Sequence, residues 1–266
     1  EVRGRVADSR TTAAVEARAG WIPLRGLVLS GDARWRRHDG GRESRAAHIA
    51  AALYRGPFSL SGEMAVGQTV QAPALPLDTA QETVDRALRL AVTTRPLSGH
   101  VALVERDAFT PLPFAELAVV PTASRSTPAT YFVAAVKLQP VSAVTLDGWY
   151  ADPRTGAADF QPPRHSRAQL TLRSKFWRTF RSGAFDLKIQ FALESWGDGI
   201  AGRTQTGAPI VLNDVTYQEW LVAFQIVGFT AFWNLRDAAL ARRQYVPGLS
   251  YPHNAQVFGV RWEFTN

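Results

Sequence analysis

The chain of 266 residues lacks cysteine entirely, and it also lacks any long hydrophobic run. Without cysteine it can form no disulfide framework, no cysteine-ligated zinc cluster and no thiol nucleophile. A membrane-spanning helix needs about 18 or more consecutive apolar residues with few or no charges. The segment that comes closest, residues 220–235, is shorter and contains Gln225 and Asn234. Helical membrane proteins and small disulfide-stabilised proteins are therefore excluded.

The sequence also lacks the features of nucleic-acid-binding proteins and of the common enzymes. Its net charge is +7, but the arginines are dispersed, and no basic run is interleaved with stacking aromatic residues. No phosphate-binding loop, dinucleotide fingerprint or zinc-protease helix is present, and no nucleophile–base–acid set can be assembled. The sequence therefore predicts no catalysis, no cofactor and no nucleic-acid partner.

Two groups of residues have side chains that bind metals in other proteins, but simpler interpretations account for them. The aspartates from Asp152 to Asp159, and Asp198 beside its glycines, have carboxylates at a loop spacing that suits calcium. Neither group fits an EF-hand pattern, and aspartate is a common turn residue. The histidines lie far apart and mostly near predicted loops, where we expect them to be solvated: His38, His48, His100, His165 and His253. No metal site is predicted.

What the sequence does contain is a regular alternation of apolar and polar residues. Hydrophobic residues make up 46% of the chain, yet its mean hydropathy is only −0.12, so the two kinds are finely interleaved. In residues 185–194 every odd position is a large apolar residue, and every even position except Ala192 is polar or charged. Residues 27–36, 58–66 and 168–176 alternate similarly. Because successive side chains of a strand point to opposite faces, the pattern predicts strands with one apolar and one polar face.

The lengths of the strands and of their connections favour a membrane barrel over a soluble β-sandwich. The predicted strands run to about ten residues or more, as a tilted crossing of a bilayer requires, whereas sandwich strands are mostly shorter. Tight turns are predicted at 22–26, 55–57, 96–98, 139–142, 179–183 and 227–228, and longer loops at 69–81, 109–129, 151–165, 197–215 and 236–253. Only the connection near residues 38–42 is short where a long one is due. Bacterial outer-membrane barrels have short periplasmic turns and longer extracellular loops.

This alternation predicts thirteen strands between Thr11 and Phe264, and a fourteenth within residues 2–7. Aromatic residues at the strand ends support the same fold, since outer-membrane barrels carry two aromatic girdles. They are Trp21, Phe58 and Trp177 beside tight turns, and Trp35, Trp149, Tyr150 and Trp196 beside longer loops. The predicted fold is an all-β, antiparallel transmembrane β-barrel, in which residues 1–266 form a single barrel region. A soluble β-sandwich binding module is the alternative from another class.

The barrel prediction assigns particular side chains to its two faces. The apolar band on the convex face is expected to expose Leu170, Leu172, Phe185, Leu187, Ile189, Phe191, Phe258 and Val260. The lumen is expected to be lined by Asp32, Arg34, Arg36, Arg173, Lys175, Asp186, Lys188, Glu194 and Arg261. A net-basic lining would favour anionic solutes, and the basic members together with Asp32 are the candidates for a ligand path. The simpler interpretation is that opposite charges pair across neighbouring strands.

The last predicted strand, residues 256–264, resembles the C-terminal signal that the outer-membrane barrel-assembly machinery recognises. Gly259, Trp262 and Phe264 occupy the glycine, aromatic and terminal-phenylalanine positions of that signal. The sequence departs from it at Val257, where a polar residue is usual, and in the two residues that follow Phe264.

The residues just upstream resemble the end of a TonB-dependent receptor. They are Asn234-Leu235-Arg236-Asp237, Tyr245-Val246-Pro247-Gly248 and Pro252, ahead of the last strand. The resemblance implies an N-terminal plug domain, a barrel of about twenty-two strands, and energised uptake of a large nutrient such as a ferric chelate. Its implied surroundings are the lipid of the outer membrane of a Gram-negative bacterium, the barrel-assembly machinery, and the TonB system acting through the plug domain. The ligand itself, a small molecule or a chelate, is not identified.

This chain has room for about fourteen strands and shows no plug-like segment. The first candidate strand, residues 1–7, is too short to span a bilayer and has only Val2, Val6 and Ala7 as apolar residues. It is a poor partner for the well-defined last strand, and unpaired backbone groups are costly in lipid. We therefore expect a fragment of a larger receptor barrel that does not close by itself. The alternative is a self-contained, passive, porin-like barrel of about fourteen strands.

Overall fold

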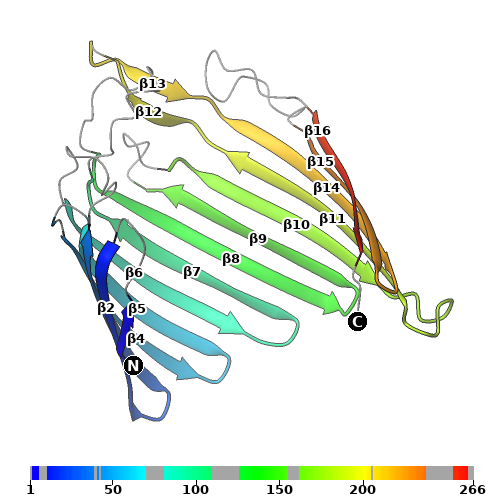
Figure 1. Cartoon of the computed structure of the whole chain (residues 1–266), viewed down its shortest axis with the longest axis horizontal. Helices are drawn as coiled ribbons and strands as arrows, with labels where there is room; N and C mark the ends of the chain where they lie inside the picture. Colours follow the sequence, from blue (N-terminus) through cyan, green and yellow to red (C-terminus); the bar gives the residue numbers. More distant parts are fainter. Residues whose placement is uncertain are drawn as a thin grey trace.

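The computed structural model describes residues 2–5, 11–38, 41, 43–69, 81–109, 126–154, 162–204, 206–237 and 254–262. Strands dominate these residues, and fourteen of them form one antiparallel sheet (Figure 1). In order across the sheet they are β1 (Val2–Arg5), β2 (Thr11–Leu24), β3 (Leu27–His38), β4 (Glu43–Arg55), β5 (Phe58–Thr69), β6 (Gln81–Thr93), β7 (Leu97–Arg106), β8 (Ala129–Val141), β9 (Val144–Pro153), β10 (His165–Ser174), β11 (Phe185–Trp196), β14 (Val215–Ile226), β15 (Phe229–Asp237) and β16 (Asn254–Trp262). The predicted all-β, antiparallel fold and its number of strands are confirmed.

The connections also follow the predicted alternation of tight and long. Three tight turns have only two residues each: 25–26 between β2 and β3, 56–57 between β4 and β5, and 227–228 between β14 and β15. Apart from residues 175–184, which join β10 to β11, the longer connections leave the opposite end of the sheet (Figure 1). One of them contains a hairpin that was not predicted, β12 (Gly199–Arg203) with β13 (Pro209–Leu212). The turn predicted at 179–183 is longer than expected, because β10 ends at Ser174 and β11 begins at Phe185.

Register between strands sorts the side chains onto two faces. Residues directly opposite one another in an antiparallel pair share a face. Leu172 lies opposite Ile189, which lies opposite Val222. The intervening positions of the same strands form the other face, where Arg167 lies opposite Glu194. The two faces are thus apolar and polar, as the alternation predicts.

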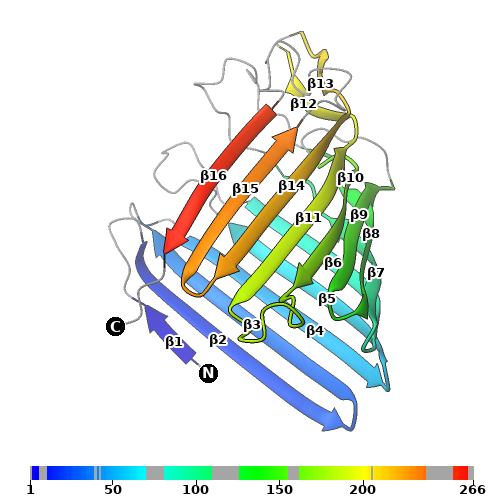
Figure 2. The same ribbon diagram turned by 90° about the vertical axis from the view of Figure 1, so that its right-hand side faces the viewer.

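The polar face is the concave one. All the buried strand residues that the structure describes lie on it: His38, Ala102, Ala129, Tyr131, Ala192, Val215 and Tyr217. Side chains converge on the inside of a curved sheet and spread apart on its outside, so this difference in burial follows from the curvature seen in Figure 2. In the described residues β1 and β16 are the two edges of the sheet, which is not closed.

The eight residues predicted on the convex face all lie on the apolar face, but their exposure differs from the prediction. Leu172, Phe258 and Val260 are 41%, 72% and 59% exposed. Leu170, Phe185, Leu187, Ile189 and Phe191 are only half-exposed. Large neighbours on the same face cover them; the ring of Phe191, for example, lies 4.4 Å from that of Trp220. The prediction was right about the face and wrong about the exposure of these five.

The convex face is not apolar throughout. Toward the end with the longer connections it carries Arg45, Arg86 and Glu105, and the last two form an ion pair of 3.7 Å. Trp35 and Tyr150 lie on this face near the same end, and Trp21 and Phe58 near the end with the tight turns. Aromatic residues therefore lie at both borders of the apolar band, and a polar rim lies at the border near the longer connections. No helix among the described residues is long and apolar enough to cross a membrane.

Candidate functional site

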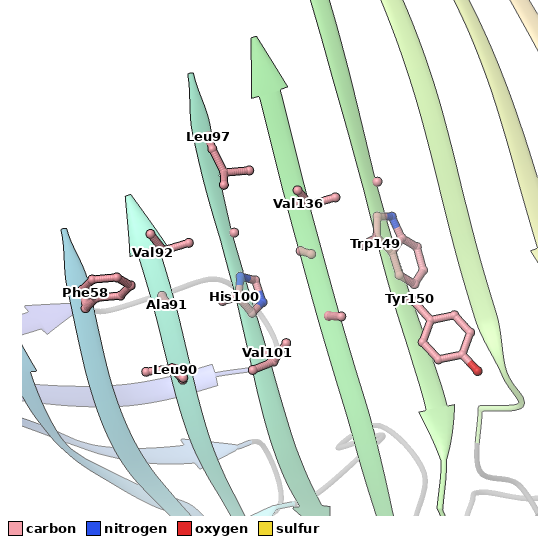
Figure 3. A pocket seen from close by; sticks show the side chains of 14 residues that line it. Phe58, Leu90, Ala91, Val92, Leu97, His100, Val101, Val136, Trp149 and Tyr150 are labelled. Atoms are coloured by element: carbon pink, nitrogen blue, oxygen red, sulfur yellow. The ribbon is translucent and has the colours of Figure 1, made fainter. Parts of the chain in front are cut away.

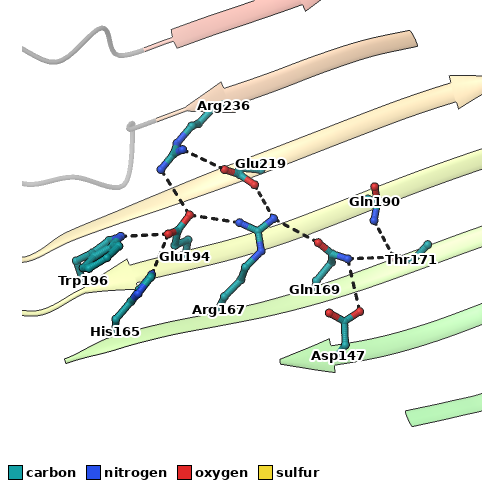
Figure 4. A network of polar contacts seen from close by, with 10 residues as sticks. All are labelled: Asp147, His165, Arg167, Gln169, Thr171, Gln190, Glu194, Trp196, Glu219 and Arg236. Atoms are coloured by element: carbon teal, nitrogen blue, oxygen red, sulfur yellow. Dashed lines mark hydrogen bonds and ion pairs between the residues drawn. The ribbon is translucent and has the colours of Figure 1, made fainter. Parts of the chain in front are cut away.

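A cluster of charged residues lies on the concave face, at the end of the sheet that bears the longer connections (Figure 4). The guanidinium of Arg167 on β10 donates to Glu194 on β11 at 3.3 Å and to Glu219 on β14 at 2.6 Å. Arg236 on β15 lies 3.5 Å from both carboxylates. Two arginines and two glutamates from four neighbouring strands of the sheet thus form a closed ring of ion pairs, which we call the charged ring.

The charged ring is partly shielded from solvent. The side chains of Glu194, Glu219 and Arg167 are 13%, 22% and 27% exposed. Charges in such a position are costly to desolvate and must be paired by good geometry. The ion pairs of the ring link β10, β11, β14 and β15 to one another. Because its two positive and two negative charges balance, the ring has no excess charge.

An aromatic stack adjoins the charged ring. The ring of His165 lies against Trp196, with centroids 3.3 Å apart, and meets the edge of Trp149 at 4.2 Å. His165 Nε2 and the indole N–H of Trp196 both lie within hydrogen-bond distance of Glu194 Oε1, at 2.8 and 3.2 Å. The register places all four residues on the concave face, on β9, β10 and β11.

This stack corrects three predictions. His165 is not a solvated loop residue but the first residue of β10, and its side chain is only 15% exposed. Trp149 and Trp196 are not lipid-facing girdle residues, since they lie on the concave face beside His165. The sequence placed them correctly at strand ends, but the assignment to a face needed the register with Arg167 and His165.

The other described histidines also differ from the prediction. His38 ends β3, is buried, and lies 2.8 Å from Ser44. His48 and His100 are strand residues of β4 and β7. His253 and Asp159 lie outside the described residues. Among the described residues, no group of three or more histidines and carboxylates is arranged to hold a metal ion.

A cavity of about 380 Å³ lies beside the aromatic stack. Its lining consists of Val104, Arg106, Tyr131, Val133, Trp149, Ala151, Pro162, Pro163, His165 and Trp196. The strand residues among them all belong to the concave face. The hydroxyl of Tyr131 donates to the carbonyl of Pro162 at 3.1 Å, which ties β8 to the connection that precedes β10.

A polar stripe continues from the charged ring along β10 toward the tight turns. It consists of alternate residues, His165, Arg167, Gln169, Thr171 and Arg173. The amide of Gln169 lies within reach of Asp147 and Thr171 at 3.5 and 3.4 Å, and Gln190 donates to Thr171 at 3.1 Å (Figure 4). At its far end Arg173 bonds Asp186 through two nitrogens. Hydrogen-bonding groups therefore line most of the length of the concave face here.

The candidates for a ligand path are not gathered at one place. Asp32, Arg34 and Arg36 follow one another on the concave face of β3, and Asp32 lies 3.3 Å from His48. Arg173 lies directly opposite Lys188 near the other end of the face. Arg261 on β16 lies opposite Thr230 on β15. Lys175 lies beyond the end of β10, where its ammonium is 5.5 Å from the ring of Trp177. The ion pair of Arg173 with Asp186 agrees with the simpler interpretation, in which opposite charges pair across neighbouring strands.

The residues of the assembly signal have separate positions. Trp262 lies on the convex face at the end of β16, and Phe264 lies outside the described residues. Gly259 lies opposite Phe232 on the concave face, where a Cβ would overlap the phenyl ring. A side chain at 259 would therefore require the ring of Phe232, which covers the backbone of Gly259, to move.

A second hollow lies on the convex face (Figure 3). Its volume is about 540 Å³, and its rim includes Phe58, Leu90, Val101 and Val136. Gly99 is among its lining residues, and a Cβ there would lie 2.7 Å from the carbonyl oxygen of Ala135. The described residues of the lining include no aspartate, glutamate, lysine or arginine, so the hollow offers mainly apolar contact.

No protein family model, curated protein or solved structure matches this chain. The functional evidence therefore comes from the sheet and from its concave face. Of the four residues in the charged ring, the sequence predicted only that Glu194 faces the lumen. It assigned Arg167, Glu219 and Arg236 to no site. Their alternation with apolar neighbours marks them as polar-face residues, but only the register brings them together.

Proposed function

We propose that this chain forms the wall of an outer-membrane β-barrel that takes up a polar solute, in the manner of the TonB-dependent receptors whose C-terminal residues it resembles. The observation that carries the proposal is the two-faced sheet. Many of its strands are 10 to 14 residues long, such as β7 and β2. A strand of about 9–11 residues is long enough for a tilted crossing of a bilayer.

The distribution of apolar side chains supports a membrane location. Soluble proteins rarely expose large continuous apolar patches, yet this chain exposes Leu53, Leu60, Leu88, Leu103 and Phe224 on the same face of five different strands. In water such a surface would associate, whereas in a bilayer it faces hydrocarbon. Aromatic residues at both borders of the band suit the interfaces between headgroups and hydrocarbon.

The concave face supports a passage for polar solutes. The polar stripe on β10 extends from the longer connections to the tight turns, with a charged or hydrogen-bonding group at every second position. Part of the resemblance to TonB-dependent receptors lies on this face too, since Arg236 belongs to both the receptor-like segment 234–237 and the charged ring. This favours a function in which the end of the chain takes part in solute contact.

The alternative is a passive, porin-like barrel. The fourteen strands of the sheet are an even number, within the range of single-chain bacterial barrels. A passive pore needs the first and last strands to pair, while a receptor wall can be continued by other strands.

The test is to refold residues 1–266 into lipid vesicles and to measure gel mobility before and after heating, together with single-channel conductance. Protease-resistant insertion without a discrete conductance is expected for a receptor wall. A compact, heat-modifiable species with a discrete conductance would instead favour the passive pore. A chain that stays in the aqueous phase as a folded β-protein would overturn both and favour the soluble sandwich.

A further inference from the structure

The cavity beside the aromatic stack has the features of a small-molecule site. It opens on the concave face next to the longer connections, where a solute would first meet the barrel wall. Its volume of about 380 Å³ lies within the range of ligand pockets. That volume suits a molecule of one or two fused rings better than a large chelate.

The walls of the cavity favour a flat, apolar ligand. Trp149, His165 and Trp196 are held together by ring contacts at one side, and Tyr131 is held by its bond to Pro162 at the other. Aromatic rings prefer offset-stacked or edge-to-face packing against other rings. Because these rings are already positioned by one another and by Glu194, little side-chain freedom is lost when a ligand enters.

Among the described residues of the lining, Arg106 supplies the one full positive charge. It stands on the concave face at the end of β7, exposed, and it has no ion-pair partner among the residues that the structure describes. The neighbouring carboxylates of Asp85 and Asp107 accept bonds from backbone N–H groups instead, at 3.1 and 3.2 Å. A guanidinium with free N–H groups beside an apolar wall recognises a carboxylate through two parallel hydrogen bonds.

The opposite side of the cavity presents no free carboxylate from the described residues. Glu194 behind His165 is already contacted by His165, Trp196, Arg167 and Arg236. The charge in the lining is therefore one-sided, with the guanidinium at one end and ring faces elsewhere.

From this arrangement we propose that the cavity binds a planar aromatic carboxylate, with its rings against Tyr131, Trp149 and His165 and its carboxylate on Arg106. The proposal names a solute class for the proposed uptake. It rests on that function only in treating the bound molecule as a transported solute. Binding itself depends on the cavity alone.

The experiment uses the whole chain in detergent micelles, with its strand content checked by circular dichroism. Equilibrium dialysis measures the binding of 2-naphthoate, of the uncharged analogue 2-naphthylmethanol, and of the non-planar cyclohexanecarboxylate. Naphthoate is expected to bind at least about tenfold more tightly than either analogue, since charge-assisted hydrogen bonds and ring contact are both needed. Arg106→Gln is expected to weaken naphthoate binding about tenfold and to abolish its preference over the alcohol.

Two matched variants complete the test. Trp149→Ala is expected to weaken binding of naphthoate and of the alcohol alike, because it removes a ring contact that both share. Arg89→Gln, on the same concave face but on β6, is expected to change neither. Equal binding of naphthoate and the alcohol, or equal loss in the Arg89 and Arg106 variants, would overturn the proposal.

Failure of this inference is distinguishable from failure of the proposed function. If the chain inserts into vesicles but shows no naphthoate binding, the solute class is wrong and the membrane wall stands. If it binds naphthoate selectively in micelles but stays out of vesicles, the site is right and the membrane function is wrong.

Discussion

The guanidinium of Arg167 on β10 lies 2.6 Å from the carboxylate of Glu219 on β14, although the whole of β11 runs between the two strands. Neighbouring strands are about 4.8 Å apart, so the pair spans about 9.6 Å of sheet. Long side chains can close that distance on a concave surface, where they lean toward each other. The contact is therefore a direct consequence of the curvature of the sheet.

This pair is expected to be coupled energetically. Arg167→Ala leaves Glu194 and Glu219 with Arg236 as their remaining arginine, and should lower the free energy of unfolding by about 1–3 kcal/mol, since partly buried carboxylates lose a charged donor. Urea unfolding in vesicles measures the loss. In a double-mutant cycle with Glu219→Ala, the two losses should add to more than the loss in the double variant. Strict additivity would show that the pair does not interact.

The pair of Arg173 with Asp186 should behave differently despite a nitrogen–oxygen distance of 2.5 Å. The side chain of Arg173 is 63% exposed, against 27% for Arg167, so solvent screens its charge. Arg173→Ala should therefore cost less than about 1 kcal/mol in the same unfolding assay. A cost as large as that of Arg167→Ala would mean that burial does not decide the strength of these pairs.

Leu187 tests the membrane placement of the convex face. If this face meets hydrocarbon near the midplane, Leu187→Arg should make folding into vesicles less favourable by about 2–4 kcal/mol. Gln190→Arg, a matched change on the concave face of the same strand, should have a much smaller effect. A cost near zero for Leu187→Arg would contradict the placement.

Gly259 tests the packing between the last two strands. Gly259→Ala places a methyl group where the ring of Phe232 lies, and should cost about 1–3 kcal/mol through overpacking. The second change Phe232→Ala should recover part of that loss by removing the ring. Gly20→Ala is the control, because a Cβ at Gly20 lies an ordinary 3.9 Å from the carbonyl oxygen of Leu29. If both glycine variants unfold at the same urea concentration, the ring is not the reason for glycine at 259.

Much of the fold could be predicted from local sequence. Residues 185–194 predicted β11, and the tight and long connections predicted the number of strands in the sheet. The β12–β13 hairpin was missed because its strands of 5 and 4 residues are too short to show a clear alternation. Five convex residues were predicted to be more exposed than they are, since exposure depends on the size of neighbours across the strand, such as Trp220 beside Phe191.

The sequence by itself determines that neighbouring residues such as Trp149 and Tyr150 lie on opposite faces, because side chains alternate along any strand, so assigning both to a girdle could not be right. Only the tertiary structure decided which of the two faces inward. The register sets Trp149 opposite Arg167, and the curvature then brings residues of separate strands into one surface. The charged ring and its aromatic stack join β9, β10, β11, β14 and β15, so they depend on pairing over long stretches of chain. No pattern within a single strand contains that information.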